Sequence, residues 1–324
     1  MNEELNWGIL GTGSIAKKFA GDLPHSRSGK LVAVGSRSRG SADAFAAEFG
    51  GQGRDSYQAM VDDPAVHAVY ISLPNQLHKE WTLKALAAGK HVLCEKPMAL
   101  NVGEAEQMFL AAERSGLVMV EAFMYRAHPL IPAMLREIAG GAIGEVRLIR
   151  SNFSFCREAS KDDGRYHAEW GGGALMDVGC YCVNLIMAVA GGEPSGVTVS
   201  AHMHEFGVDD YAVGTLSFPN NVLATFSCGM RSFGDWHTYI GGSEGWIEVD
   251  APWFGGHNSF VVVKGQEAER RVVQVEESRP LYAVEADRFA DVVLKKQQPW
   301  ITKGESLATM RVLDELRRQA GLPV

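Results

Sequence analysis

The first 123 positions alternate short apolar runs with longer segments in which apolar residues recur every three or four positions. The runs have strand length and are apolar at almost every position: L-N-W-G-I-L, L-V-A-V-G-S, A-V-Y-I-S-L and H-V-L-C-E. The spacing between them predicts helices, including 41–49 and 77–88, the second closed by Gly89. Buried strands that alternate with helices are typical of a doubly wound parallel sheet, so we expect an α/β domain over residues 1–123.

After Ile143 the pattern changes to apolar and polar residues in strict alternation, which predicts half-buried strands. These include V-T-V-S-A-H-M-H and a hairpin that turns at P-N-N, residues 219–221. Helices are expected near 174–190, 282–295 and 303–320. We therefore expect residues 124–324 to form an α+β domain with a large, mostly antiparallel open sheet. The second face of such a sheet needs a cover, and a second copy of the chain is a reasonable candidate.

Composition narrows the class of protein and its partners. The 324 residues are 46% hydrophobic and carry a formal net charge of −8, which disfavours nucleic acid or an anionic membrane as the main partner. The five cysteines are scattered without a C-x-x-C pair, so we expect free thiols in a reducing compartment. The start, M-N-E-E-L-N-W, has no signal-peptide pattern, and no uninterrupted apolar run approaches a membrane span. A soluble cytoplasmic protein is expected.

The first apolar run ends in G-T-G-S-I-A, residues 11–16, and opens a helix. In this pattern Gly11 allows the tight turn, Gly13 lets the backbone approach a pyrophosphate, and the small Ala16 lets helix and strand pack closely. A helix N-terminus also favours phosphate. A plain strand-to-helix turn is the alternative, but the position at the start of an alternating β/α domain favours a dinucleotide-binding Rossmann fold.

The end of the second apolar run bears on the choice of nicotinamide cofactor. An NAD site usually has Asp or Glu here to accept from the ribose 2′-hydroxyl. This chain has Ser36, Arg37, Ser38 and Arg39 instead, and hydroxyl and guanidinium groups suit a 2′-phosphate. We expect NADP to be preferred. The alternative is that these are solvated loop residues and that NAD also serves.

The fourth run is followed by E-K-P, residues 95–97, and Pro97 indicates that the strand stops there. Ligands of open α/β sheets bind beyond the carboxyl ends of the strands, which is where Lys96 is expected. A lysine there can hold a ribose hydroxyl, polarise a substrate oxygen or lower the pKa of a neighbouring acid. A surface lysine paired with Glu95 is the alternative.

A second candidate motif is W-G-G-G-A-L-M-D-V-G-C-Y, residues 170–181. The helix that follows the glycines is apolar all round except for Asp177, Tyr181 and Asn184, whose spacing puts them on one face. Buried polar groups need partners, which are either structural hydrogen bonds or a ligand. In the functional interpretation, Asp177 and Tyr181 meet Lys96 beside the nicotinamide, and Tyr181 takes a proton from an alcohol.

These motifs together resemble the glucose-fructose oxidoreductase/inositol dehydrogenase/MocA (Gfo/Idh/MocA) superfamily of two-domain NAD(P)-dependent oxidoreductases. The resemblance runs through the whole chain and includes P-N-Q-L-H at 74–78 and E-A-F-M-Y-R-A-H-P at 121–129. Tyrosine at 181, where many members have histidine, is similar to the subgroup of dimeric dihydrodiol dehydrogenase, NADP-dependent D-xylose dehydrogenase and glucose-fructose oxidoreductase. Ala127 departs from that subgroup, where an aromatic residue is expected, and so the pocket nearby is expected to differ in shape.

The resemblance implies roles for particular residues. Lys96 and Tyr181 would form the catalytic pair, Asp177 would orient the substrate, and the open sheet would form a homodimer or a higher homo-oligomer. The cofactor would be bound by Gly11, Gly13, Ser14, Ile15, Ala16, Ser36, Arg37, Ser38, Leu73, Pro74, Asn75, His78, Glu95 and Lys96.

Other residues are weaker candidates. Five side chains that border the inferred cleft would shape the substrate pocket together with Asp177 and Tyr181: Tyr125, Arg126, Phe155, Arg157 and Trp170. Arg126 and Arg157 are equally well explained as solvated side chains. His202 and His204 form H-x-H without a third ligand nearby, so no metal site is expected.

The sequence thus predicts an NADP-preferring dehydrogenase acting on a C–OH group of a small carbohydrate or polyol, such as D-xylose oxidised at its anomeric carbon to a lactone. A trans-dihydrodiol dehydrogenase with the same cofactor and base is the nearest alternative. A dinucleotide-binding regulatory protein without catalysis is a third. Turnover separates this last possibility from the first two.

Overall fold

The computed structural model describes residues 4–324, which form two compact units. Unit 1 combines the residues up to 99 with 103–127 and 279–303, and unit 2 combines 100–102, 128–278 and 304–324. The expected boundary at residue 123 placed everything beyond it in the second domain. Residues 124–127 and 279–303 instead pack with unit 1, because an amphipathic pattern shows that a helix is half-buried but not which layer it covers.

The expected parallel sheet of unit 1 is confirmed. Its six strands are all parallel in the order β3-β2-β1-β4-β5-β6, which is the doubly wound order of dinucleotide-binding domains. The strands are β1 (Leu5–Leu10), β2 (Gly29–Gly35), β3 (Gln52–Arg54), β4 (Ala68–Ile71), β5 (His91–Glu95) and β6 (Met119–Ala122). Strands β4 and β6 are buried at every position, as parallel strands covered by helices should be.

Helices connect these strands. They are α1 (Ser14–Asp22), α2 (Arg39–Phe49), α3 (Tyr57–Val61), α4 (His78–Ala87), α5 (Val102–Ser115) and α6 (Met124–Ala127), with 3-10 turns η1 (Leu23–His25) and η2 (Asn75–Leu77). The predicted helices at 41–49 and 77–88 are therefore present with slightly different ends. Gly89 follows α4 with φ of +76°, a conformation that glycine adopts without strain.

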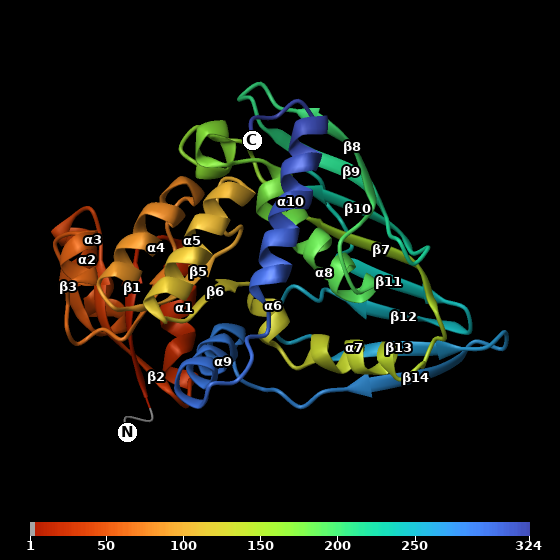
Figure 1. The fold of residues 1–324 in the computed structure, drawn as a ribbon, viewed down its shortest axis with the longest axis horizontal. Helices are drawn as coiled ribbons and strands as arrows, with labels where there is room; N and C mark the ends of the chain where they lie inside the picture. The colour runs from red at the N-terminus through yellow and green to blue at the C-terminus, as the bar shows by residue number, and fades with distance from the viewer. Residues whose placement is uncertain (1–3) are drawn as a thin grey trace. The chain divides into compact units, whose positions relative to one another are not determined.

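Helix α9 (Leu281–Lys295) returns to unit 1 from far along the chain. It packs against α1, and in Figure 1 its blue ribbon lies beside the red α1 and β2. The indole of Trp7 contacts the ring of Phe289 at a centroid distance of 5.2 Å. The Asp287 carboxylate accepts from the hydroxyls of Ser26 (2.6 Å) and Ser28 (2.7 Å). This helix therefore completes the core of unit 1.

Unit 2 is built on an eight-stranded sheet in the order β14-β13-β12-β11-β7-β10-β9-β8. Only β7 and β10 run parallel, so the expected mostly antiparallel sheet is confirmed. The predicted hairpin at 219–221 joins β9 to β10. The strands are β7 (Val146–Ser154), β8 (Gly196–Met203), β9 (Asp209–Ser217), β10 (Leu223–Gly229), β11 (His237–Gly242), β12 (Gly245–Asp250), β13 (Ser259–Lys264) and β14 (Glu269–Gln274).

Figure 1 shows the helices of unit 2 on one face of this sheet. They are α7 (Leu130–Ala139), α8 (Cys180–Ala190) and α10 (Lys303–Gln319), and α8 packs on β7 and β10. The expected helix at 174–190 has two parts, because a π-helical turn (Leu175–Gly179) precedes α8. Asn184 of α8 donates to the hydroxyl of Thr309 on α10 at 3.1 Å, so one polar residue of the expected stripe has a structural partner.

The helical segment 168–190 contains an 18-residue stretch with a mean hydropathy of 1.7, which by length and composition alone could cross a membrane. Asp177 interrupts this stretch, so it is not the uninterrupted apolar run that the sequence-based expectation concerned. However, 89% of this 18-residue stretch is buried inside the fold. It is the central helix of unit 2, packed against the sheet.

Candidate active site

The glycine turn after β1 has the geometry expected of a phosphate cradle. Gly11 has φ of +104°, and a Cβ there would lie 2.9 Å from the Ser72 carbonyl oxygen. Gly13 caps α1, and a Cβ built on it would meet nothing within 4 Å. Ala16 is fully buried against the sheet. The backbone at Gly13 is thus open to a ligand at the N-terminus of a nine-residue helix, which fits a pyrophosphate.

In the loop after β2, some polar residues make structural hydrogen bonds or ion pairs and one is exposed. The Ser38 hydroxyl caps α2 by accepting from Ser41 N–H at 3.4 Å. Arg39 Nε is paired with Asp43 at 2.8 Å. Arg37 is exposed at the same strand end, close enough to Tyr57 to act on the pKa of its hydroxyl, which burial raises. Arg37 precedes α2, and within residues 4–324 it makes no ion pair with a carboxylate, unlike Arg39.

The residues between β4 and α4 lie at the same carboxyl edge of the sheet. Leu73 and Pro74 lead into η2, which begins at Asn75. His78 is fully buried, and its ring nitrogens lie 3.0 Å from the Pro97 carbonyl oxygen and 2.8 Å from that of Leu73. The imidazole thereby links the loop after β4 to the loop after β5. Because both ring nitrogens face backbone carbonyls, we expect His78 to support cofactor binding indirectly, by holding these two loops in place.

Strand β5 ends at Glu95, as the position of Pro97 predicts. The Glu95 carboxylate is buried and accepts hydrogen bonds at both oxygens. Its Oε1 accepts from the Tyr70 hydroxyl of β4, and its Oε2 accepts from the backbone N–H of Lys96 at 3.2 Å. These bonds fix the strand end from which Lys96 projects, at the sheet edge that also carries the glycine turn.

Asp177 lies in the π-helical turn of unit 2 and has a strong partner. Arg165 Nε donates to Asp177 Oδ2 at 2.7 Å, and Arg165 Nη1 donates to Asp163 Oδ1 at 3.2 Å. The two carboxylates raise the pKa of the Arg165 guanidinium above its ordinary value, with Asp177 as the largest cause. A charge-assisted bond of this kind keeps a carboxylate ionised and oriented. Asp177 is therefore suited to accept hydrogen bonds from a ligand hydroxyl.

Tyr181, at the start of α8, sits in an aromatic cluster. Its ring meets the edges of Phe153 (5.1 Å between centroids) and Trp253 (5.8 Å), and those two rings stack on each other at 5.5 Å. Trp253 is fully buried, and its indole N–H donates to the Asn152 carbonyl at 3.0 Å. The phenol ring is thus held in one orientation on the helix.

The expected substrate-pocket residues divide between the units. Phe155 and Trp170 belong to unit 2, where Trp170 stacks on His167 at 4.1 Å and the Arg165 guanidinium lies 5.9 Å from the Phe155 ring centroid. Tyr125 and Arg126 lie in α6 of unit 1. Both are buried, and Arg126 Nη2 donates to the Trp300 carbonyl at 3.4 Å. Arg126 is therefore not a solvated side chain.

The H-x-H pair on β8 has other partners. The His202 Nδ1 lies 2.7 Å from Asp210 Oδ1, and His204 packs edge-on against Tyr166 at 5.3 Å. Within residues 4–324 there is no group of three or more His, Cys, Asp or Glu side chains arranged to hold a metal ion. All five cysteines are free, which confirms the expected thiols.

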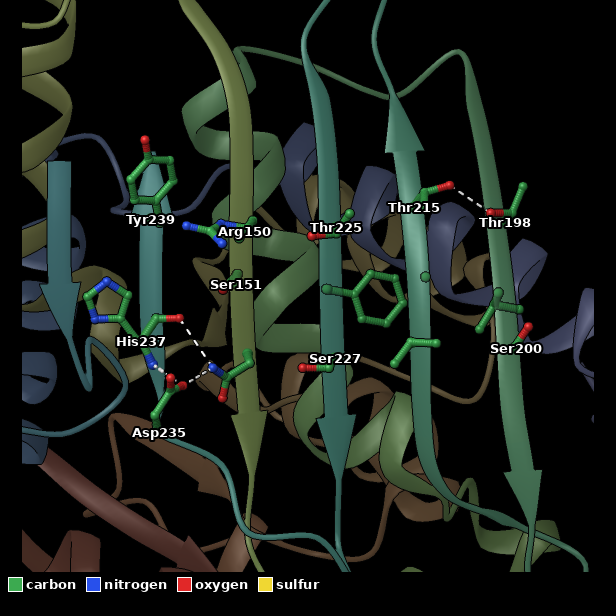
Figure 2. Close-up of a pocket in the computed structure, with 15 residues that line it drawn as sticks. Arg150, Ser151, Thr198, Ser200, Thr215, Thr225, Ser227, Asp235, His237 and Tyr239 are labelled. Atoms are coloured by element: carbon green, nitrogen blue, oxygen red, sulfur yellow. Dashed lines mark hydrogen bonds between the residues drawn. The ribbon is translucent and has the colours of Figure 1, made fainter. Parts of the chain in front are cut away.

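The face of the eight-stranded sheet opposite α8 carries a shallow hollow of about 690 Å³. Figure 2 shows it lined by hydroxyl groups on neighbouring strands, including Thr198, Thr215 and Thr225, with Arg150 and Tyr239 at one side. The Thr198 and Thr215 hydroxyls lie 2.7 Å apart. None of the residues expected at the active site lines this hollow, so it is a separate feature of the sheet.

The residues that the sequence did not single out are Arg165, Phe153 and Asp209. Asp209 is fully buried and accepts from Leu175 N–H at 2.7 Å, where the helical segment begins. The need of a partly buried carboxylate for hydrogen-bond donors indicated that Asp177 would have a partner such as Arg165, but it did not specify which residue. The other two are fixed by contacts between distant segments, which leave no local signal.

Comparison with known proteins agrees with this geometry. Residues 5–123 match the family described as oxidoreductase, NAD-binding Rossmann fold, and residues 133–248 match the GFO/IDH/MocA C-terminal domain. The chain is 31% identical over 332 residues to trans-1,2-dihydrobenzene-1,2-diol dehydrogenase of Mus musculus, covering 98% of this chain and 97% of the relative. It is 31% identical over 316 residues to D-xylose 1-dehydrogenase (NADP(+)) 2 of Haloferax volcanii, covering 97% of each.

A solved structure shows the same fold. A 3-ketoreductase from Actinomadura kijaniata, determined in complex with NADP and TDP-benzene, superposes with a TM-score of 0.88 at 28% identity and covers 98% of both chains. At this coverage the likeness extends over both units.

Proposed function

The chain belongs to the GFO/IDH/MocA family of NAD(P)-dependent oxidoreductases, and on that premise we propose that it is an NADP-preferring dehydrogenase of a cyclic sugar or polyol. The sugar or diol class follows from the family and its relatives. The proposed reaction is oxidation of a C–OH group, with an aldose such as D-xylose converted at its anomeric carbon to a lactone. Three side chains take part in the proposed reaction: Lys96, Asp177 and Tyr181.

One observation carries the proposal. The open backbone at Gly13 and the strand end that carries Lys96 lie at one edge of the same parallel sheet. Ligands of this fold bind beyond that edge. A lysine held there by the Glu95 bonds is suited to a place beside a bound dinucleotide, where its charge favours an ionised neighbour.

In the proposed step, the Tyr181 hydroxyl group, in its deprotonated form, takes the proton of the substrate alcohol. Lys96 stabilises the phenolate by its positive charge, and Asp177 accepts a hydrogen bond from a second substrate hydroxyl. The hydride would leave the same carbon, and a nicotinamide held at the glycine turn would be its acceptor. The products are the carbonyl compound, or lactone for an aldose, the reduced cofactor and one proton.

The exposed face of the eight-stranded sheet supports a proposed homodimer. Alternate residues of β9 and β10 are exposed there, including Tyr211 (42%), Val213 (56%) and Leu223 (57%). Apolar side chains in such an array favour burial against another surface. A second copy that presents the same face would provide it.

The proposal is tested by following reduced-cofactor absorbance when the purified protein is mixed with NADP or NAD and a panel of aldoses, inositols and a trans-dihydrodiol. Turnover with an aldose and NADP is expected. Replacing Tyr181 with Phe should lower kcat by at least about 100-fold and leave NADP affinity within about twofold, because only the proton acceptor is lost. Tyr211→Phe, on the exposed sheet face, is the matched control and should keep wild-type kcat.

The panel also separates the alternatives. Turnover with the trans-dihydrodiol alone would indicate the activity for which the mouse relative is named, and it would contradict the proposed sugar substrate. Dinucleotide binding without turnover of any compound would favour the regulatory protein. Full activity of the Tyr181→Phe variant would remove the assignment of the base.

A further inference from the structure

Glu285 of α9 is a buried acid that the proposed reaction does not use. The side chain is fully buried, and within residues 4–324 neither carboxyl oxygen has a hydrogen-bond partner. A charged carboxylate in that state is costly, since burial removes its hydration and nothing replaces it. Glu285 lies within unit 1, in the helix that returns to pack on α1.

Its neighbours are acids and phenols. Glu95 at the end of β5 acts on Glu285 electrostatically, and burial together with that carboxylate raises the pKa of Glu285 well above its usual range. Tyr70 donates to Glu95, and Tyr282 lies one helical turn before Glu285. Glu95 and Glu285 are among the groups that raise the pKa of Tyr70 and Tyr282, in both cases after burial itself. The cluster therefore holds two carboxyl groups and two neutral phenols.

Two carboxyl groups in one buried cluster do not both ionise near neutral pH, because like charges repel strongly where water is excluded. The hydrogen bonds decide which one is charged. Glu95 accepts from the Tyr70 hydroxyl and from Lys96 N–H, and such bonds favour the ionised form. Glu285 accepts none. The negative charge thus belongs on Glu95 and the proton on Glu285.

Other charged groups stand on the elements packed around α9. Lys18 of α1 pairs with Asp22 at 2.9 Å, and Asp22 in turn lies 3.4 Å from the backbone N–H of Tyr282. Further charged groups on or next to these elements include Lys17 of α1, His25 of η1, Lys30 of β2, Arg126 of α6, Arg279 just before α9, and Asp287, Arg288, Asp291 and Lys295 of α9 itself. Both oxygens of Asp287 have partners elsewhere, since Oδ1 accepts from the hydroxyls of Ser26 and Ser28 and Oδ2 pairs with Arg279.

We propose that Glu285 is a positioning residue that stays protonated, so that Glu95 alone carries the charge that fixes the strand end bearing Lys96. When Glu285 loses its proton at alkaline pH, its charge opposes that of Glu95 and weakens the bonds from Tyr70 and Lys96 N–H. Lys96 then loses its fixed place at the edge of the sheet. The inference rests on the proposed function only for the role of Lys96, and the protonation itself is tested without substrate.

The test of protonation is infrared spectroscopy of the full chain near pH 7, comparing wild type with Glu285→Gln and Glu95→Gln. Loss of a protonated-carboxyl band in Glu285→Gln, with the band kept in Glu95→Gln, is expected. Loss only in Glu95→Gln places the proton on Glu95 and overturns the proposal, and so does loss in both variants or in neither. If a variant does not fold, the wild type alone must show a protonated carboxyl at pH 7 that disappears at alkaline pH, and its absence overturns the proposal equally.

The test of positioning is the pH dependence of NADPH affinity, measured by cofactor fluorescence. Wild-type affinity is expected to fall at alkaline pH, and in Glu285→Gln the midpoint of this fall should move up by at least about one pH unit, because the variant has no proton to lose. Glu106→Gln, exposed on α5, is the control and should keep the wild-type midpoint. Coincident profiles for wild type and Glu285→Gln would show that Glu285 does not act on Lys96. A protein that binds NADPH but oxidises no alcohol still gives this result, so failure of the proposed function is recognised separately.

Discussion

The Arg165 guanidinium joins Asp163 and Asp177, and this bridge determines how the polar face of the central helix of unit 2 is presented. With one oxygen bound to Arg165 Nε, the Asp177 carboxylate keeps a fixed orientation. Tyr181 is fixed by a different force, the edge contacts with Phe153 and Trp253. Two side chains four residues apart are thus oriented by electrostatics and by packing, respectively.

Cofactor choice belongs to the same scale. Replacing Arg37 with Ala is expected to weaken NADP binding by about tenfold or more and NAD binding by less than about twofold, because a guanidinium is worth about 1.5 to 3 kcal/mol only where a phosphate is present. Dissociation constants for both cofactors, from fluorescence titration, provide the check. Arg39→Ala is the matched control, since Arg39 is already paired with Asp43. Equal losses for NADP and NAD in Arg37→Ala would refute the cofactor assignment.

Among single residues, those in local motifs were predictable and those with distant partners were not. Gly11, Gly13 and Ala16 have the conformation, open space and burial that their motif predicts, since the turn and its helix are contiguous. Arg165 lies twelve positions before Asp177 in an irregular segment, and nothing in its surroundings marks it as a partner. The structure also gives His78 two backbone carbonyls as neighbours, which the motif alone does not imply.

At the scale of elements, the start of the central helix of unit 2 depends on one buried carboxylate. Asp209 on β9 accepts from Leu175 N–H, and its second oxygen lies where a side chain on Gly173 would be. Strand alternation predicts β9 and the adjacent hairpin well. The π-helical turn was not predictable, because periodicity over five residues does not distinguish it from an α-helical turn.

Gly173 is expected to be intolerant of a side chain. It has φ of +110°, and a Cβ would lie 2.1 Å from Asp209 Oδ1. Gly173→Ala should therefore lower the free energy of unfolding by at least about 2 kcal/mol, measured by urea denaturation. Gly192→Ala is the control, since a Cβ there meets nothing within 4 Å, and it should change stability by less than about 0.5 kcal/mol. Similar losses in both variants would contradict this account.

Asp209 also makes a pH-dependent contribution. Burial raises its pKa from 3.8 to about 6, so the folded state binds more protons than the unfolded state between those values. Its contribution to stability is present at low pH and is lost as pH rises from about 4 to about 6, by about 3 kcal/mol at roughly 1.4 kcal/mol per pH unit. In Asp209→Asn the side-chain oxygen can still accept a hydrogen bond from Leu175 N–H, but the side chain does not bind or release a proton in this pH range.

The comparison is made by denaturant unfolding of wild type and Asp209→Asn at several pH values. The free energy of unfolding of Asp209→Asn relative to wild type should rise across this window. Taking the difference removes the carboxylates whose pKa values are lowered, such as Asp63 and Asp235, because they are common to both proteins. A difference that does not change with pH would show that Asp209 is ionised throughout.

At the scale of the molecule, the sequence predicts two domains with different hydrophobic patterns, and the structure contains the two corresponding sheets. The alternation of apolar runs and helices ends where the parallel sheet ends, which is why the first domain was predictable. The return of α9 was not, because its apolar face shows only that it is half-buried. Its contacts with Trp7, Ser26 and Ser28 become visible only in three dimensions.

A fragment of residues 1–127 should therefore be incompletely folded. Without α9 it exposes Trp7 and loses the bonds of Asp287 to the loop before β2. The same fragment joined by a flexible linker to residues 279–303 should unfold cooperatively, with a Tm higher by at least about 10 °C. Circular dichroism on heating measures both. Equal melting of the two fragments would show that α9 is dispensable for unit 1.

Unit 1 is built from segments that lie far apart in the sequence, and this sets the order in which its parts are synthesised. All six strands of its sheet have been synthesised once residue 122 is made, but α9 is synthesised only after the whole of β7 to β14. At roughly 5 to 20 residues per second, the sheet waits on the order of ten seconds or more for the helix that covers Trp7. During that interval the nascent chain presents an uncovered apolar surface. Chaperones that bind such surfaces have their opportunity then, and the second unit must begin to fold before the first is finished.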